Sequence, residues 1–193
     1  ALKSLKDGQH TVTFYAVDNA GNEEKPKTRV FYIDDTPPVP VVTFEGDRAA
    51  GPDGMDFISP RTVVKITAND DRSGVGKIEY AIENADFITY ASPFRFSPQL
   101  KKCAIEVRVT DKAGNTSAKY KVAARMDAQP PKSTYKLEGP SVVKGGIVYA
   151  SGQTRIALSA ADDGAGVASL RYRVNDGTES AYTQPFTIAT EGR

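Results

Sequence analysis

Apolar and polar residues alternate with a period of two over most of the chain, and no stretch keeps a helical period. The clearest run alternates the apolar positions Cys103, Ile105, Val107 and Val109 with Lys102, Ala104, Glu106, Arg108 and Thr110. Val64, Ile66 and Ala68 share one phase in a second run, and Ile78, Tyr80 and Ile82 share one in a third. A strand with one buried face requires this pattern, so the sequence predicts an all-β fold.

The chain also repeats itself. Asp18 and Asp111 each open an Asp-x-Ala-Gly-Asn motif and lie 93 positions apart, as do the Pro-Pro pairs that begin at Pro37 and Pro130. The Asp-Asp-x-x-Gly-Val motif at Asp70 returns at Asp162, and the Pro-Phe pair at Pro93 returns at Pro185, both after 92 positions. These offsets predict tandem repeats with a period of about 93 residues.

Only residues 36–128 contain all four landmarks, so we expect one complete repeat there. Residues 1–35 are expected to be the C-terminal part of a repeat with strands F and G, and residues 129–193 the N-terminal part with strands A to E. About seven alternating strands in about 100 residues are typical of an immunoglobulin-like sandwich. The expected strands of the complete repeat are 39–46, 61–69, 75–83, 86–90, 93–98, 102–110 and 116–125.

Three motifs carry a resemblance to a known family. They are the Pro-Pro pair, the pattern Asp-x-Ser/Ala-Gly-Val-x-x-Ile/Leu-x-Tyr that begins at Asp71 and Asp163, and Asp-x-Ala-Gly-Asn. Together they resemble the bacterial immunoglobulin-like repeats found in tandem in large surface and secreted proteins. The resemblance implies a sandwich fold and a role as a stalk, an adhesin repeat or an accessory domain, although a fold alone does not define a function.

Acidic residues gather in loops that an immunoglobulin-like fold places at one end of the sandwich. We expect a calcium site at this joint, because Ca²⁺ takes carboxylate, amide and backbone oxygens as ligands. The candidate ligands are Asp34, Asp35, Asp70, Asp71, Asp111 and Asn115, with Asp127, Asp162 and Asp163 at a second joint. The alternative is that these side chains only form turns by accepting hydrogen bonds from nearby backbone amides. We favour turn formation, since the loops lack the dense acids of a dedicated calcium loop.

Composition excludes several functions. The formal net charge of +1 argues against a nucleic-acid partner, and the single residues His10 and Cys103 exclude a multi-histidine metal site and an internal disulfide. No apolar run is long enough to insert into a membrane, and an export signal is expected outside this stretch. No catalytic motif occurs, so we expect no enzyme activity.

We therefore predict a non-catalytic structural or adhesive module of a larger bacterial surface or envelope protein. It is expected outside the cytoplasm: extracellular, at the cell surface or in the periplasm. The expected partners are neighbouring repeats and a host or cell-surface protein or polysaccharide. The alternative is a carbohydrate-binding or accessory domain of a secreted hydrolase, for which Tyr80 and Tyr172 are candidate stacking residues unless they fill the core.

The two part-repeats together hold about 100 residues, close to one sandwich. Strand addition between molecules could therefore complete them, with the N-terminal piece of one chain joining the C-terminal piece of the next. The simpler explanation, which we favour, is that these residues are a stretch of a longer array.

Overall fold

The computed structural model describes residues 5–187, and these residues form strands, turns and loops without a helix. The chain divides into two compact units. The first unit contains residues 1–48 and 58–126, and the second contains residues 49–57 and 127–193. The all-β immunoglobulin-like fold predicted from the sequence is confirmed.

The complete repeat is built from two layers of strands. One layer pairs β3 (Val39–Glu45) with β6 (Val63–Asn69), and Phe94 adds an isolated bridge to Val64. The other layer is a six-stranded sheet in the order β4-β5-β10-β9-β7-β8. Its strands are β4 (Arg48–Ala49), β5 (Phe57–Ile58), β10 (Tyr120–Met126), β9 (Lys102–Asp111), β7 (Val75–Ile82) and β8 (Ile88–Thr89).

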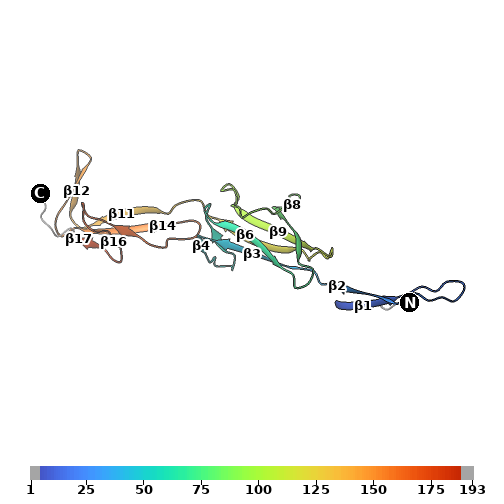
Figure 1. Ribbon diagram of the computed structural model, residues 1–193. Helices are drawn as coiled ribbons and strands as arrows, with labels where there is room; N and C mark the ends of the chain where they lie inside the picture. Colours follow the sequence, from blue (N-terminus) through green and yellow to red (C-terminus); the bar gives the residue numbers. More distant parts are fainter. Residues whose placement is uncertain (1–4, 188–193) are drawn as a thin grey trace. The chain divides into compact units, whose positions relative to one another are not determined.

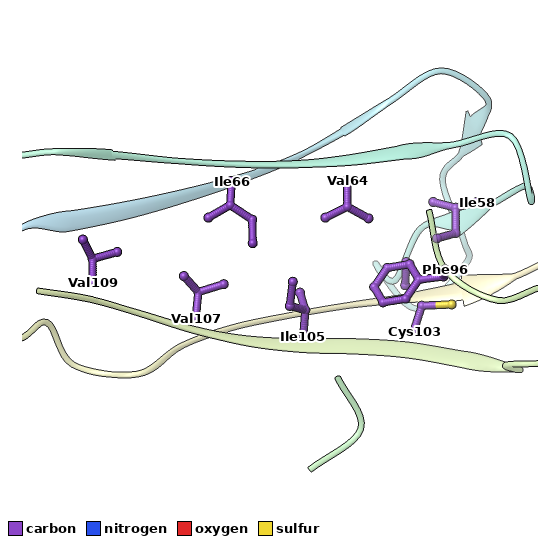
Figure 2. Close-up of a cluster of buried hydrophobic side chains, with 9 residues drawn as sticks. Ile58, Val64, Ile66, Phe96, Cys103, Ile105, Val107 and Val109 are labelled. Atoms are coloured by element: carbon purple, nitrogen blue, oxygen red, sulfur yellow. The ribbon is translucent and has the colours of Figure 1, made fainter. Parts of the chain in front are cut away.

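The core of this repeat lies between the two layers, as the alternating pattern predicts. In Figure 2 the side chains of Val64 and Ile66 on β6 point toward Ile105 and Val107 on β9. Strand β9 alternates buried and half-buried positions along nearly its whole length. The buried hydrophobic cluster comprises Ile58, Val64, Ile66, Phe96, Cys103, Ile105, Val107, Val109 and Ala124.

Five expected strands agree with the structure to within two residues at each end, and the other two differ. The run 93–98 forms no strand, because Pro93 and Pro98 have no amide hydrogen to donate and only Phe94 makes ladder bonds, both to Val64. The expected strand 116–125 begins only at Tyr120, after an isolated bridge at Thr116. The short strands β4 and β5 have too few residues for a period of two to reveal them.

The first unit also contains a separate two-stranded hairpin (Figure 1), formed by β1 (Gly8–Phe14) and β2 (Lys27–Ile33). Gly8 pairs with Ile33, and the hairpin has the same register as β9 and β10 once the offset of 93 is applied. Its register is thus the one expected of an F–G hairpin in residues 1–35.

The second unit repeats the first layer of the complete repeat and part of the other layer. Its three-stranded sheet has the order β11-β14-β17, with β11 (Lys132–Glu138), β14 (Arg155–Ala161) and β17 (Phe186–Thr187). Two further pairs are β12 (Ser141–Lys144) with β13 (Ile147–Ala150), and β15 (Arg171–Tyr172) with β16 (Ser180–Ala181). The division at residues 35/36 and 128/129 predicted from the sequence stays a prediction, since compactness alone groups the β1–β2 hairpin with the complete repeat.

Candidate functional site

Three of the predicted carboxylates converge at one end of the complete repeat. Asp34 follows β2, Asp70 follows β6, and Asp111 is the last residue of β9. One carboxylate oxygen from each lies within 4.8 Å of the other two. Asp111 is buried, and Asp34 and Asp70 are half-buried. Among residues 5–187 this is the only such cluster of potential metal-ligating side chains.

The loop after β6 begins with Asp70, and one of its backbone amides donates a hydrogen bond to Asp34. Asp70 Oδ1 accepts hydrogen bonds from the amides of Arg72, at 3.2 Å, and Gly74, at 2.5 Å. Gly74 has a φ of 80°, which a residue without a Cβ adopts without strain. Asp34 Oδ2 accepts a hydrogen bond from the amide of Ser73 at 2.9 Å. The linker after β2 is therefore tied to this loop through a carboxylate.

The loop after β9 holds the linker from the other side. Asp111 Oδ1 accepts hydrogen bonds from the amides of Gly114 and Asn115, and Oδ2 accepts one from Nδ2 of Asn115 at 2.8 Å. The same Asn115 Nδ2 donates to the backbone carbonyl of Asp34 at 2.8 Å. Asp111 thus orients Asn115, and Asn115 binds the linker.

Two predicted ligands lie outside the cluster, and one important carboxylate was missed. Asp35 and Asp71 are exposed, and neither belongs to the group of three. The Asp7 carboxylate accepts hydrogen bonds from the backbone amide of Asp35, at 2.7 Å, and from the hydroxyl of Thr36. It also forms an ion pair with Arg72 at 3.3 Å. Position 7 corresponds to Leu100 one period later, so no repeated acid marked it in the sequence.

Hydrogen bonds favour the ionised form of Asp34, Asp7 and Asp111. The Ser73 hydroxyl is the main reason why the pKa of Asp34 lies below its usual value, and the Thr36 hydroxyl does the same for Asp7. Burial opposes ionisation of Asp111, yet the side chain and amide of Asn115 outweigh it and lower the pKa of Asp111 as well. The site therefore presents negative charge to whatever it binds.

The second joint repeats half of this arrangement. Asp162 Oδ1 accepts hydrogen bonds from the amides of Gly164 and Gly166, and Asp127 Oδ2 accepts one from Ala165 at 2.7 Å. These are the bonds of Asp70 and Asp34, displaced by 92 or 93 positions. A Cβ on Gly164 would lie 2.5 Å from the Asp127 carboxylate, so a side chain there would require this carboxylate to move, although the equivalent position of the first joint carries Arg72. Asp163 is exposed.

The geometry accounts for both interpretations of the acidic loops. Asp70, Asp111 and Asp162 each accept hydrogen bonds from backbone amides two to four residues downstream, which is the turn-forming role favoured from the sequence. The cluster of Asp34, Asp70 and Asp111 also offers oxygens of the kind that Ca²⁺ takes. Calcium therefore stays a prediction at the first joint.

The other chemically suggestive residues have structural surroundings. Cys103 lies in the core, where burial raises the pKa of its thiol to about 11, so it is no nucleophile near neutral pH. The Nε2 atom of the half-buried His10 lies 2.6 Å from the carbonyl of Lys6. Tyr80 stacks on Phe94 with ring centroids 4.6 Å apart, and Tyr172 stacks on Phe186 at 4.1 Å. Both tyrosines are half-buried and belong to aromatic clusters, in agreement with the core role expected from their phase.

The paired sheets, the repeated joint and the missing antibody Cys pair define a class of protein: tandem immunoglobulin-like sandwich repeats of non-antibody type. Residues 3–35 match a family model described as a bacterial Ig-like domain. The match confirms the resemblance seen in the sequence motifs and covers the β1–β2 hairpin and the start of the linker. A comparison with curated proteins finds no match.

The family match favours a structural or surface module, and such domains are typically non-catalytic and often extracellular. No helix long and apolar enough to cross a membrane occurs in residues 5–187.

Proposed function

We propose that this chain is a spacer segment of a bacterial cell-surface or envelope protein, in which each joint holds successive repeats at a restricted angle. The observation that carries the proposal is the hydrogen-bonded linker at residues 34–36. It is bound by the loop after β6, by the loop after β9 and by Asp7 of the preceding hairpin. Pro37 and Pro38 follow at once, and prolines stiffen a linker further. The spacer would hold a binding element, for a host protein or a polysaccharide, away from the cell.

A distance measurement between two spin labels tests whether the joint is stiff. Labels on Thr11→Cys and Lys65→Cys are both exposed, one on the hairpin and one on the complete repeat. Buried Cys103, with its raised pKa, is not expected to react with the label. We expect a narrow distance distribution, which Asn115→Ala broadens because the linker carbonyl of Asp34 loses its donor.

Asn22→Ala is the matched control for that experiment. Asn22 binds Asp18 as Asn115 binds Asp111, yet it has no bond to the linker. It should leave the distribution narrow. A broad distribution in the unmodified chain would show a flexible joint and contradict the spacer proposal.

We also propose that Ca²⁺ binds at the first joint, because Asp34, Asp70 and Asp111 bring three carboxylates together there. Added CaCl₂ is then expected to raise the thermal midpoint of the first unit, since a ligand that binds only the folded state stabilises it. Asp70→Asn should abolish the increase, and Asp86→Asn, at an exposed position after β7, should retain it. A thermal midpoint that is the same in CaCl₂ and in chelator would contradict calcium binding. The acidic side chains would then have only the turn-forming role.

A further inference from the structure

The six-stranded sheet of the complete repeat has an outer face that carries more positive than negative side chains. Glu79 pairs with Arg108, and Ala81 with Glu106, across the β7–β9 ladder. These positions alternate with the buried ones, so they face away from the core. The cations on or beside this face are Lys77, Lys102, Arg108, Lys119, Lys121 and Arg125.

The carboxylates of this face are shared between cations. Glu79 forms ion pairs with Lys77 at 2.7 Å and with Arg108 at 3.0 Å. Glu106 forms ion pairs with Lys119 at 2.6 Å and with Lys121 at 3.1 Å. Because each of these carboxylates meets two cations, the face keeps a positive charge that attracts anions.

A groove of about 210 Å³ lies on the same face. Ala81, Ala104 and Ala123 form its floor, and Ala104 pairs with Ala123 across the β9–β10 ladder. Lys102 and Lys121 also line the groove. The hollow exists because three neighbouring outward positions carry only a methyl group.

The floor of the groove is a property of the complete repeat and is not required by the repeated fold. At the equivalent positions the β1–β2 hairpin has Thr11 for Ala104 and Val30 for Ala123, and the second unit has Arg173 for Ala81. Each of these residues is larger than alanine and would reduce the hollow. The repeated strands therefore do not account for the three alanines.

A tight turn after β7 forms one rim of the groove. The amide of Ala85 donates to the carbonyl of Ile82 at 3.0 Å, and Glu83 and Asn84 have φ values of 49° and 66°. Positive φ at both central positions defines a primed hairpin turn, which usually takes asparagine or glycine. Glu83 is tied to the sheet instead, since its Oε1 atom accepts a hydrogen bond from the amide of Ala104 at 2.8 Å. Its second oxygen and the Asn84 amide group can accept hydrogen bonds from a ligand.

The groove thus combines cations for a negative group with acceptors for hydroxyl groups. We propose that it binds an acidic polysaccharide whose sugar residues each carry one carboxylate and several hydroxyls. Lys102 and Lys121 would contact the carboxylate, and Glu83 and Asn84 would accept from the hydroxyls. Pockets for whole drug-sized ligands usually measure about 300 to 1,000 Å³, so this one has room for roughly one sugar residue of a longer chain.

A sugar acid fits better than a more densely charged chain. Polyphosphate or an acidic peptide offers few hydroxyl donors, and its charges would be repelled by Glu83 and Glu106. All strands of the groove belong to the complete repeat, so the proposal does not depend on the spacer role or on the calcium site.

Titration calorimetry with a short oligogalacturonate, in buffer with chelator, tests the proposal. We expect saturable binding that weakens as NaCl is added, because salt screens exposed charges. A neutral maltooligosaccharide of the same length, which has no carboxylate, should not bind. The proposal is overturned if oligogalacturonate does not bind, or if polyglutamate binds more tightly than oligogalacturonate does.

Two kinds of substitution locate the site. Lys102→Gln and Lys121→Gln should each weaken binding about two- to fivefold, as expected for the loss of an exposed ion pair. Lys65→Gln is the matched control, since it removes one exposed cation from the other layer. Ala123→Leu should abolish binding by filling the groove, whereas Thr67→Leu adds an apolar side chain at an exposed position of β6 and should have no effect.

Amide chemical shifts of the unmodified chain decide the question even where a variant fails to fold. On addition of oligogalacturonate, the amide signals of Ala104 and Ala123 should move, and those of Thr43 and Thr67 on the other layer should not. Binding with shifts only outside the β7–β9–β10 face would assign the ligand to another surface and overturn the proposal.

Discussion

Replacing Ile105 by alanine is expected to lower the free energy of unfolding of the first unit by about 2 to 5 kcal/mol, the range found for large-to-small changes in packed cores. Ile105 is 2% exposed and lies in the buried cluster beneath Val64 (Figure 2). Buried side chains from both layers surround Ile105, so a cavity left by the truncation cannot collapse fully. Urea unfolding followed by tyrosine fluorescence measures the change, since the chain has nine tyrosines and no tryptophan.

Val12→Ala is the matched control for this substitution. Val12 occupies the equivalent position on β1, where the apolar face is open, so the same kind of truncation should cost less than about 0.5 kcal/mol in dilute solution. If the two variants lose the same unfolding free energy, the apolar face of the β1–β2 hairpin is covered in solution. A loss below 1 kcal/mol for Ile105→Ala, on the scale of an exposed site, would contradict the core assignment.

The fold could be predicted because its strongest signals are local and repeated. The alternation through β9 marks one buried face, and the offsets of 92 and 93 place the same strands in each part of the chain. The sequence also predicted that the carboxylates of Asp70 and Asp111 lie close together, because they stand where β6 and β9 end at the same end of the sandwich.

Other features depend on tertiary pairing, which local pattern does not encode. Asp7 joins the linker through Asp35 and Thr36, and no repeated motif marks it. The predicted strand at 93–98 failed because its prolines remove ladder donors, although its apolar phase is correct.

Thr62 is a further residue whose importance only the structure shows, because a lone threonine before a strand carries no signal in the sequence. Its side chain is 1% exposed. The hydroxyl accepts a hydrogen bond from the backbone amide of Ser59 at 3.1 Å and donates one to the backbone carbonyl of Asp47 at 2.5 Å. Thr154 makes the same two bonds, to Ser151 and Pro140, at 3.1 and 2.6 Å. One hydroxyl in each repeat thus joins the two ends of the connection between the first two long strands.

Thr62→Val keeps the shape of the side chain and leaves the amide of Ser59 and the carbonyl of Asp47 without this partner in two part-buried hydrogen bonds. It should lower the free energy of unfolding by about 1 to 3 kcal/mol. Thr62→Ser keeps the hydroxyl and loses one methyl group, so it should cost only about 0.8 kcal/mol. Urea midpoints of the two variants separate the hydrogen bonds from the packing. If Thr62→Val costs no more unfolding free energy than Thr62→Ser, the two hydrogen bonds add no net stability. The equivalent Thr154 would then be explained by packing against the turn alone.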